Sequence, residues 1–242
     1  MRRNTVSKRV EDSRTPVQQR MPRDERMAAM LDQAVSVLAE EGFAASTRRL
    51  AAALGVTQAL VYKHFASKEA FISAVLDRAF GGKGRDPIAL GDETKPLRER
   101  LVAFYTGRSD KAAGGRIRLF VRAALEGWPV PARRGAALTY QVFEPVVRAL
   151  RREAVLPPLE ERPMLRGERE LVMMLHGSVV FLGIREHVYH MPMPDDRAAV
   201  VGLQVDIFLG GALPALRRIH AGEADASLMV EQLAPGGRRQ PV

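Results

Sequence analysis

The chain has 242 residues, 46% of them hydrophobic, which is enough for one large or two smaller globular domains with a substantial core. It contains no cysteine, which excludes disulfide bridges and thiolate metal sites and is compatible with a reducing cytoplasm. A formal net charge of +9 favours a polyanionic partner, and much of the excess lies in the first 23 residues.

Residues 1–22 predict a basic arm that is disordered when free, because Arg, Ser, Thr, Gln and Pro occur there without hydrophobic periodicity. No apolar run follows the basic residues, so no secretory signal is indicated. Two interpretations of the arm stay open: a second contact along the DNA minor groove or phosphates, or a solubilising segment without a specific contact.

An apolar stripe begins after Asp24 and predicts a first helix, which Gly42 ends. Residues 46–65 then predict two short helices separated by a sharp turn. Ser46 and Thr47 are good N-cap residues for the first of these helices. Gly55 can adopt the left-handed backbone that the turn needs.

The second short helix, capped by Thr57, has a polar outer face. Leu60, Val61 and Phe65 are expected on its inner side. On the outer side, Gln58 can pair with adenine, and Lys63 can reach guanine or phosphate. An ordinary helical hairpin with solvated lysines is the alternative, but the cap, turn glycine and outer face together have the spacing of a helix-turn-helix.

A fourth helix is expected from Ser67 to Phe80, with Ser67 as its cap and Phe71 and Val75 facing inward. Lys68 lies near its start, where a cation is slightly unfavourable to the helix dipole. This position favours a role for Lys68 in contacting phosphate.

The run GFAASTRRLAAALGVTQALVYKHFASKEAF resembles the N-terminal domain of the TetR family of bacterial transcriptional regulators. The resemblance covers about residues 24–80 and is weak beyond them. It implies an all-α fold, with an N-terminal three-helix helix-turn-helix domain followed by a helical ligand-binding and dimerisation domain. The residues expected to contact DNA are Thr47, Arg48, Thr57, Gln58, Ala59, Leu60, Tyr62, Lys63, His64 and Lys68.

Residues 81–96 are rich in Gly, Asp and Pro and are expected to form a linker. Two amphipathic helices follow at 97–105 and 116–128. A longer helix is expected at 132–154, with a kink or break at Pro145, where a backbone hydrogen bond is lost.

The last two strong helices are expected at 168–189 and 195–218, with Asp195 capping the second. Both are apolar on more than one side, so each needs partners on several sides. The family resemblance implies a homodimer through these two helices; burial inside a monomeric bundle is the alternative. The most apolar stretch, 171–184, is too short to cross a bilayer, and no membrane attachment is expected.

A mostly apolar effector pocket is expected among the C-terminal helices. Its candidate residues also suit an ordinary core, and they are Phe104, Phe120, Trp128, Tyr140, Phe143, Met173 and His176.

Neither catalysis nor metal binding has a convincing motif. His187 and His190 have a spacing that metal ligands can use, beside Glu186, but no third ligand is fixed. Gly81-Gly82-Lys83-Gly84 lacks the strand that precedes a phosphate-binding loop, and no candidate nucleophile has a partner. We therefore expect no metal, no cofactor and no enzymatic activity.

The sequence thus predicts a cytoplasmic, ligand-responsive repressor that binds palindromic double-stranded operator DNA as a homodimer and is released by a small, largely apolar effector. The expected parts are a basic arm (1–22), a DNA-binding domain (23–80), a linker (81–96), an effector-binding and dimerisation domain (97–220) and a flexible tail (221–242). The alternative is a helical ligand-binding protein or enzyme in which the helix-turn-helix is incidental.

Overall fold

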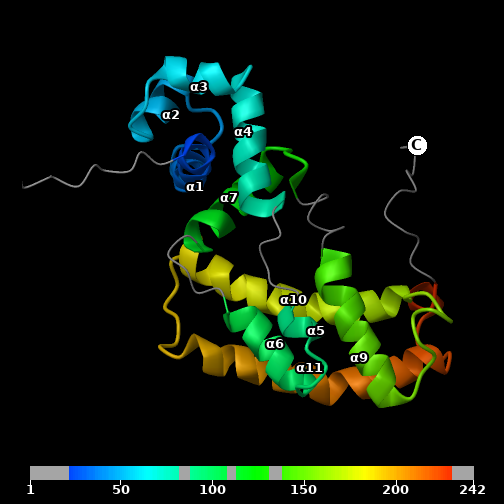
Figure 1. Cartoon of the computed structure of the whole chain (residues 1–242). Coiled ribbons are helices and arrows are strands. Elements are labelled where there is room, and N and C mark those ends of the chain that lie inside the picture. The colour runs from blue at the N-terminus through cyan, green and yellow to red at the C-terminus, as the bar shows by residue number, and fades with distance from the viewer. Residues whose placement is uncertain (1–21, 82–87, 108–112, 131–137, 231–242) are drawn as a thin grey trace, which may run out of the picture.

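The computed structural model describes residues 22–81, 88–107, 113–130 and 138–230, and over these ranges all regular structure is helical. Figure 1 shows a small group of helices at one end and two long helices across the other. The elements in order are α1 (Arg23–Glu41), α2 (Thr47–Ala53), α3 (Gln58–His64), α4 (Lys68–Leu76), the π-helical turn η1 (Asp77–Gly81), α5 (Ile88–Gly91), α6 (Leu97–Thr106), α7 (Ala113–Leu125), the π-helical turn η2 (Thr139–Phe143), α9 (Glu144–Ala154), α10 (Arg166–His187), α11 (Arg197–His220) and the 3₁₀ turn η3 (Ala226–Leu228).

Helices α2, α3 and α4 begin at side-chain caps, and helices α1 and α2 are followed by glycines with positive φ. The side chains of Ser46, Thr57 and Ser67 each accept a hydrogen bond from a backbone N–H in the first turn of α2, α3 and α4, at 3.1 to 3.2 Å. Gly42 and Gly55 have φ values of 79° and 67°, which glycine adopts without steric cost. These caps and helix ends are confirmed.

Helix α7 completes the core of the N-terminal unit. Leu38 of α1, Leu50 of α2, Val61 of α3 and Phe71 of α4 are buried in one cluster, and Leu119 of α7 lies in the same cluster with no exposed surface. The α7 helix packs against α1 on one side and α10 on the other. An element of the expected C-terminal domain therefore belongs to the core of the N-terminal one.

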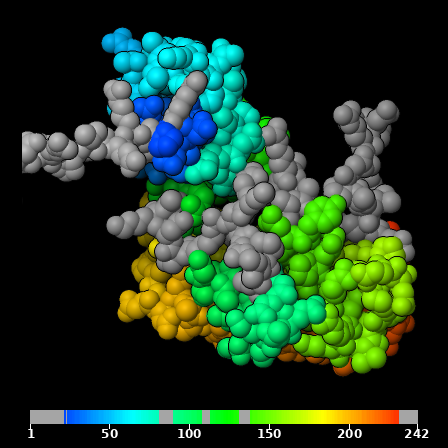
Figure 2. Space-filling view, viewed as in Figure 1, coloured from blue at the N-terminus to red at the C-terminus, as the bar shows by residue number. Residues whose placement is uncertain are grey.

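A second core holds the larger C-terminal unit together. It is formed by buried faces of α5, α6, η2, α9, α10 and α11, and α11 packs against α6, α9 and α10. Figure 2 shows the N-terminal unit, coloured blue to cyan, standing out from this larger body.

Several element boundaries differ from the sequence-based expectation. The second half of the expected linker forms α5, where Leu90 is almost fully buried. The first residues of the expected helix at 132–154, up to 137, lie outside the described ranges. In the rest, η2 comes first and α9 begins at Glu144 with Pro145 in its first turn, so the helix changes type next to the predicted break. Asp196 caps α11, where Asp195 was expected, because its side chain accepts a hydrogen bond from the Ala199 N–H at 2.9 Å.

The beginning of the expected tail is packed against the body. Gly222 turns the chain after α11 with φ 79°, and Asp225 caps η3 by accepting from the Ser227 N–H. The Arg166 N–H then donates to the Val230 carbonyl at 2.9 Å. The chain is thus held against α10 as far as residue 230, whereas residues 1–21 of the expected arm and 231–242 lie outside the described residues.

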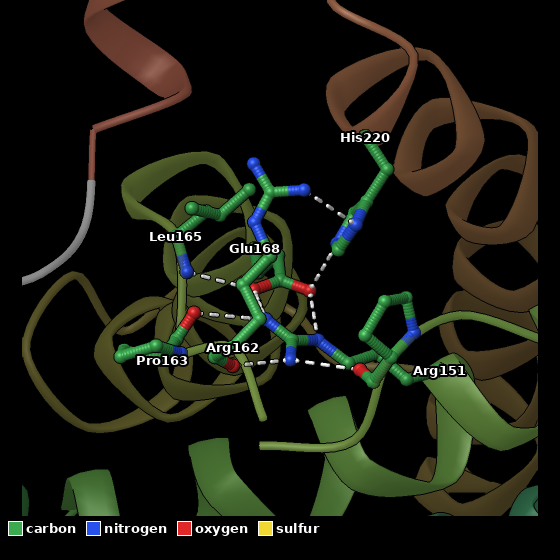
Figure 3. A network of polar contacts seen from close by, with 7 residues as sticks. Arg151, Arg162, Pro163, Leu165, Glu168 and His220 are labelled. Atoms are coloured by element: carbon green, nitrogen blue, oxygen red, sulfur yellow. Dashed lines mark hydrogen bonds and ion pairs between the residues drawn. The ribbon is translucent and has the colours of Figure 1, made fainter. Parts of the chain in front are cut away.

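A buried ionic network ties α9, α10 and α11 together, as Figure 3 shows. Arg151 donates from two nitrogens to the Glu168 carboxylate at 2.7 and 2.5 Å, and it also donates to three backbone carbonyls of the loop between α9 and α10. His220, at the end of α11, lies with Nε2 3.1 Å from Glu168 Oε1. Because the Arg151 guanidinium and the Glu168 carboxylate pair with each other, both charges are accommodated inside the protein.

Candidate nucleic-acid interface

The two helices of the helix-turn-helix are joined by a turn that depends on Gly55. The Gly55 N–H donates to the Ala52 carbonyl and the Val56 N–H donates to the Ala51 carbonyl, both at 3.0 Å. Thr57 then starts α3, whose inner side is anchored by Val61, only 1% exposed. Most of the other α3 residues are exposed.

The exposed face of α3 carries most of the residues predicted to contact DNA. Gln58, Ala59, Lys63 and Thr57 just before the helix are exposed, and His64 is half-buried. Leu60 was expected on the inner side, but 37% of its surface is exposed. The seven-residue α3 buries Val61 alone, so Leu60 joins the outer face.

Tyr62 and Thr47 connect the two helices. Tyr62 is 47% exposed, and its hydroxyl lies 3.2 Å from the Thr47 hydroxyl. Thr47 itself is buried, with 6% of its surface exposed. The structure thus places Thr47 behind the outer face, where it orients the Tyr62 ring.

Three basic side chains near this face make no ion pair within the part of the chain that the structure describes. Within the described ranges Arg48 and Lys63 have no carboxylate partner and Lys68 interacts only with the charge of its neighbour Glu69, whereas Arg49 pairs with Glu41. Arg48 is exposed and Lys68, in the first turn of α4, is half-buried. An unneutralised positive charge beside exposed polar side chains is the chemistry that a phosphate backbone requires.

The seven residues proposed for an effector pocket are divided between different parts of the molecule. Phe104, Phe143, Met173 and His176 lie in or against the C-terminal core, where the Phe143 and His176 rings are 6.4 Å apart. Phe120 and Trp128 instead pack against the N-terminal core, and Tyr140 is 61% exposed. The structure therefore does not bring the seven into one cluster, and the pocket remains a prediction.

Tyr105, an aromatic residue of the same region that is not among the seven pocket candidates, contacts two of them. Its hydroxyl lies 3.4 Å from His176 Nδ1, and its ring packs edge-on against Phe104.

The histidines at the end of α10 do not assemble a metal site. His187 Nε2 lies 3.5 Å from Glu186 Oε2, and His190 is exposed beyond the helix end. Among the residues that the structure describes, no three His, Cys, Asp or Glu side chains are grouped so that they could hold a metal ion.

Comparisons with known proteins identify the N-terminal unit. Residues 30–75 match the family model for bacterial regulatory proteins of the TetR family. An HTH-type transcriptional repressor of Mycobacterium tuberculosis and an HTH-type transcriptional regulator of Mycobacterium bovis are each 36% identical over 110 residues. These alignments cover 45% of this chain, and the chain spans about half (51%) of the length of each relative.

The overall fold also has a solved counterpart. A TetR-like transcriptional regulator from Rhodococcus sp. RHA1 superposes with a TM-score of 0.53, covering 79% of this chain and all of that chain. The two sequences are 22% identical, so the likeness is one of fold. It extends the similarity from the helix-turn-helix to the helices that follow it.

Proposed function

We propose that the chain is a member of the TetR family of bacterial regulatory proteins, and that it is a cytoplasmic transcriptional repressor that binds a palindromic operator as a homodimer and is released by a small molecule. The observation that carries the DNA-binding part is the outer face of α3, where Gln58, Ala59 and Lys63 are exposed and Lys63 has no carboxylate partner within the described ranges. A helix presented in this way can enter a major groove and contact base edges.

A mobility-shift assay with duplexes from the region upstream of the protein's own coding sequence tests this function. We expect one duplex to be retarded at salt concentrations that release an unrelated duplex of equal length. Failure of the folded protein to retard any duplex at low salt would overturn the proposal.

The proposed dimer rests on the outward sides of α10 and α11. Met174 and Phe181 of α10 are 60% and 47% exposed, and Leu203 and Ile207 of α11 are 60% and 68% exposed. These residues recur at helical spacing, so each helix presents an apolar stripe beside its buried one. A second copy of the chain would cover both stripes around a two-fold axis.

The same stripe explains why α11 has the composition of a membrane-spanning helix. Among the described helices, α11 alone is long and apolar enough for that, and one third of its most apolar stretch is buried inside the protein. Asp206 in the middle of α11 pairs with Arg98 of α6 at 2.6 Å. A charged residue held in this way suits a helix packed between two protein layers better than one surrounded by lipid.

We propose that α7 transmits a conformational change from the C-terminal unit to the DNA-binding unit when a small molecule binds. It packs against α1 of the DNA-binding unit and against α10 of the C-terminal unit, so a shift of α10 moves the support of the helix-turn-helix. The two recognition helices of a dimer must span roughly 34 to 36 Å to reach successive major grooves, and a small rotation prevents joint docking.

Thermodynamic reciprocity provides the test of release. An effector that weakens operator binding must itself be bound more weakly, by the same factor, when operator is present. We expect calorimetric titrations of the effector with and without operator to differ by that factor. Equal effector affinities would refute the coupling while leaving DNA binding intact.

A further inference from the structure

A surface depression lies between α5, α6 and the start of α9, remote from the outer face of α3. Its volume is about 220 Å³. Leu90, Tyr140 and Pro145 supply apolar walls, and Arg100 is among its charged lining residues. In Figure 1, α5, α6 and α9 lie in the C-terminal body, at the opposite end of the molecule from α3.

The Arg100 side chain is buried and makes no ion pair within the described ranges, although its charge acts on nearby Glu93. Only 7% of its surface is exposed, and one terminal nitrogen donates to the Leu90 carbonyl at 2.8 Å. Within the described part of the chain, its Nε has no hydrogen-bond partner and no carboxylate pairs with the guanidinium. Arg151, which is only 1% exposed, differs from Arg100 because it donates two hydrogen bonds to the Glu168 carboxylate. A buried charge without a partner is costly, so Arg100 calls for an anion.

The neighbouring charges already have other partners. Glu93 is held by Arg152 at 2.8 Å, and Arg148 is paired with Glu160. The hydrogen bond and charge of Arg152 hold the pKa of Glu93 below its ordinary value, and the charge of Arg100 lowers it further. Glu144 is the one lining carboxylate without an ion pair in the described ranges. The depression therefore offers one guanidinium and one carboxylate that make no ion pair within the described ranges.

We propose that this depression binds a small organic monocarboxylate through Arg100. The planar guanidinium donates to carboxylate oxygens in a geometry that matches both groups. The apolar part of the acid lies against Leu90, Tyr140 and Pro145. The volume is below the roughly 300 Å³ of pockets for drug-sized ligands, which limits the ligand to about one ring. Glu144 repels a second carboxylate. DNA binding has no part in this inference, which goes beyond the proposed function.

Fluorine NMR of 4-fluorobenzoate with the full chain, in the absence of DNA, tests the site. Wild-type protein is expected to broaden the fluorine signal of the acid. At equal concentration, about tenfold less of the neutral isostere 4-fluorobenzamide is expected to bind, because hydrogen bonds to a charged carboxylate are stronger than those to a neutral amide. Arg100→Met should weaken benzoate binding by about tenfold or more. The matched control is Arg98→Met on the same helix, which leaves the depression intact and should bind as wild type does.

A second variant keeps the test decisive if Arg100→Met fails to fold, which circular dichroism will report. Glu144→Gln removes the unmatched carboxylate at the surface, so it should bind the acid a few-fold more tightly and leave amide binding unchanged. The site would be refuted by equal binding of acid and amide to the wild type, by absence of acid binding, or by equal losses in the Arg98 and Arg100 variants.

Discussion

At the scale of single residues, Gln58 and Lys68 are expected to contribute differently to DNA binding. Gln58→Ala should weaken binding to the preferred operator by about 1 to 3 kcal/mol and relax the sequence preference, because an exposed base-contacting amide is lost. Lys68→Ala should weaken binding to all sequences similarly and flatten its salt dependence, since a phosphate contact carries no sequence information.

Binding isotherms on specific and scrambled duplexes at several salt concentrations separate the two roles. Each variant serves as the control for the other. Equal losses of specific and non-specific binding in Gln58→Ala would show that this residue does not read bases.

Glu168 is expected to make stability depend on acidic pH. Burial alone would raise the pKa of Glu168, but hydrogen bonds from Arg151, the Leu165 N–H and His220 outweigh it and hold the pKa below the ordinary 4.5. The unfolded state therefore takes up the proton more readily, so this stabilisation is present above pH 4.5 and is lost as pH falls through the native pKa.

Glu168→Gln should thus lower stability at neutral pH by about 3 to 5 kcal/mol, because Arg151 is left buried without its counterion. Its stability should also fall less steeply on acidification. Urea unfolding across a pH series measures both effects. Glu160→Gln, which breaks an exposed pair with Arg148, is the control and should cost no more than about 1 kcal/mol.

The sequence predicted the role of a residue when neighbouring residues determine that role. It did not predict the role when a contact with a distant residue determines it. Ser67 caps α4 because a serine followed by a helical run has few alternatives. Thr47 was equally plausible as a cap or a DNA contact, but a hydroxyl fifteen residues away, on Tyr62, determines its place. Local periodicity contains no information about such a pair.

At the scale of elements, the turn between α2 and α3 should depend on backbone conformation alone. Nothing lies within 4 Å of the position that a Cβ would occupy at Gly55, whose φ is 67°. Gly55→Ala should therefore destabilise the protein by about 1 to 2 kcal/mol through left-handed backbone strain. Gly55→Asn should cost less, since asparagine tolerates this conformation.

Thermal unfolding of the two variants beside the wild type measures this difference. An unchanged melting temperature in Gly55→Ala, or a greater loss in the asparagine variant, would contradict the assignment of strain to the backbone.

The types of the elements were more predictable than their partners. The apolar periodicity of α10 and α11 gave two long helices within two residues of their observed ends. The partner of α7 was not predictable, because an apolar stripe such as that of Leu119 and Ala123 does not specify which other helix covers it. α5 was missed because it has four residues, too few for a period to be seen.

At the scale of the whole molecule, charge on the outer stripe of α11 should dissociate the proposed dimer. Ile207→Asp places a carboxylate where the second copy would pack, and a charge buried at an interface without a partner is costly. Light scattering should then give the chain mass of 26.7 kDa, whereas the wild type gives twice that mass. Operator affinity should fall by about 100-fold or more, because the two half-sites are no longer bound together.

Leu125→Asp is the matched control, because Leu125 is an equally apolar residue with 82% of its surface exposed, at the end of α7. It should remain a dimer. A monomeric wild type, or a dimeric Ile207→Asp variant with normal operator affinity, would exclude α11 as the dimer interface.

The position of α7 in the N-terminal core restricts how this protein can be recombined with its relatives. A junction after η1 separates α1 to α4 from Leu119, which fills their core. A junction after α7 instead transfers α6 with Leu101 and Phe104, which belong to the C-terminal core. No single junction in the described chain leaves both cores whole. A chimera that exchanges operator specificity should therefore transplant the outer residues of α3 onto this scaffold, or exchange α7 together with the first four helices while keeping the native α5 and α6.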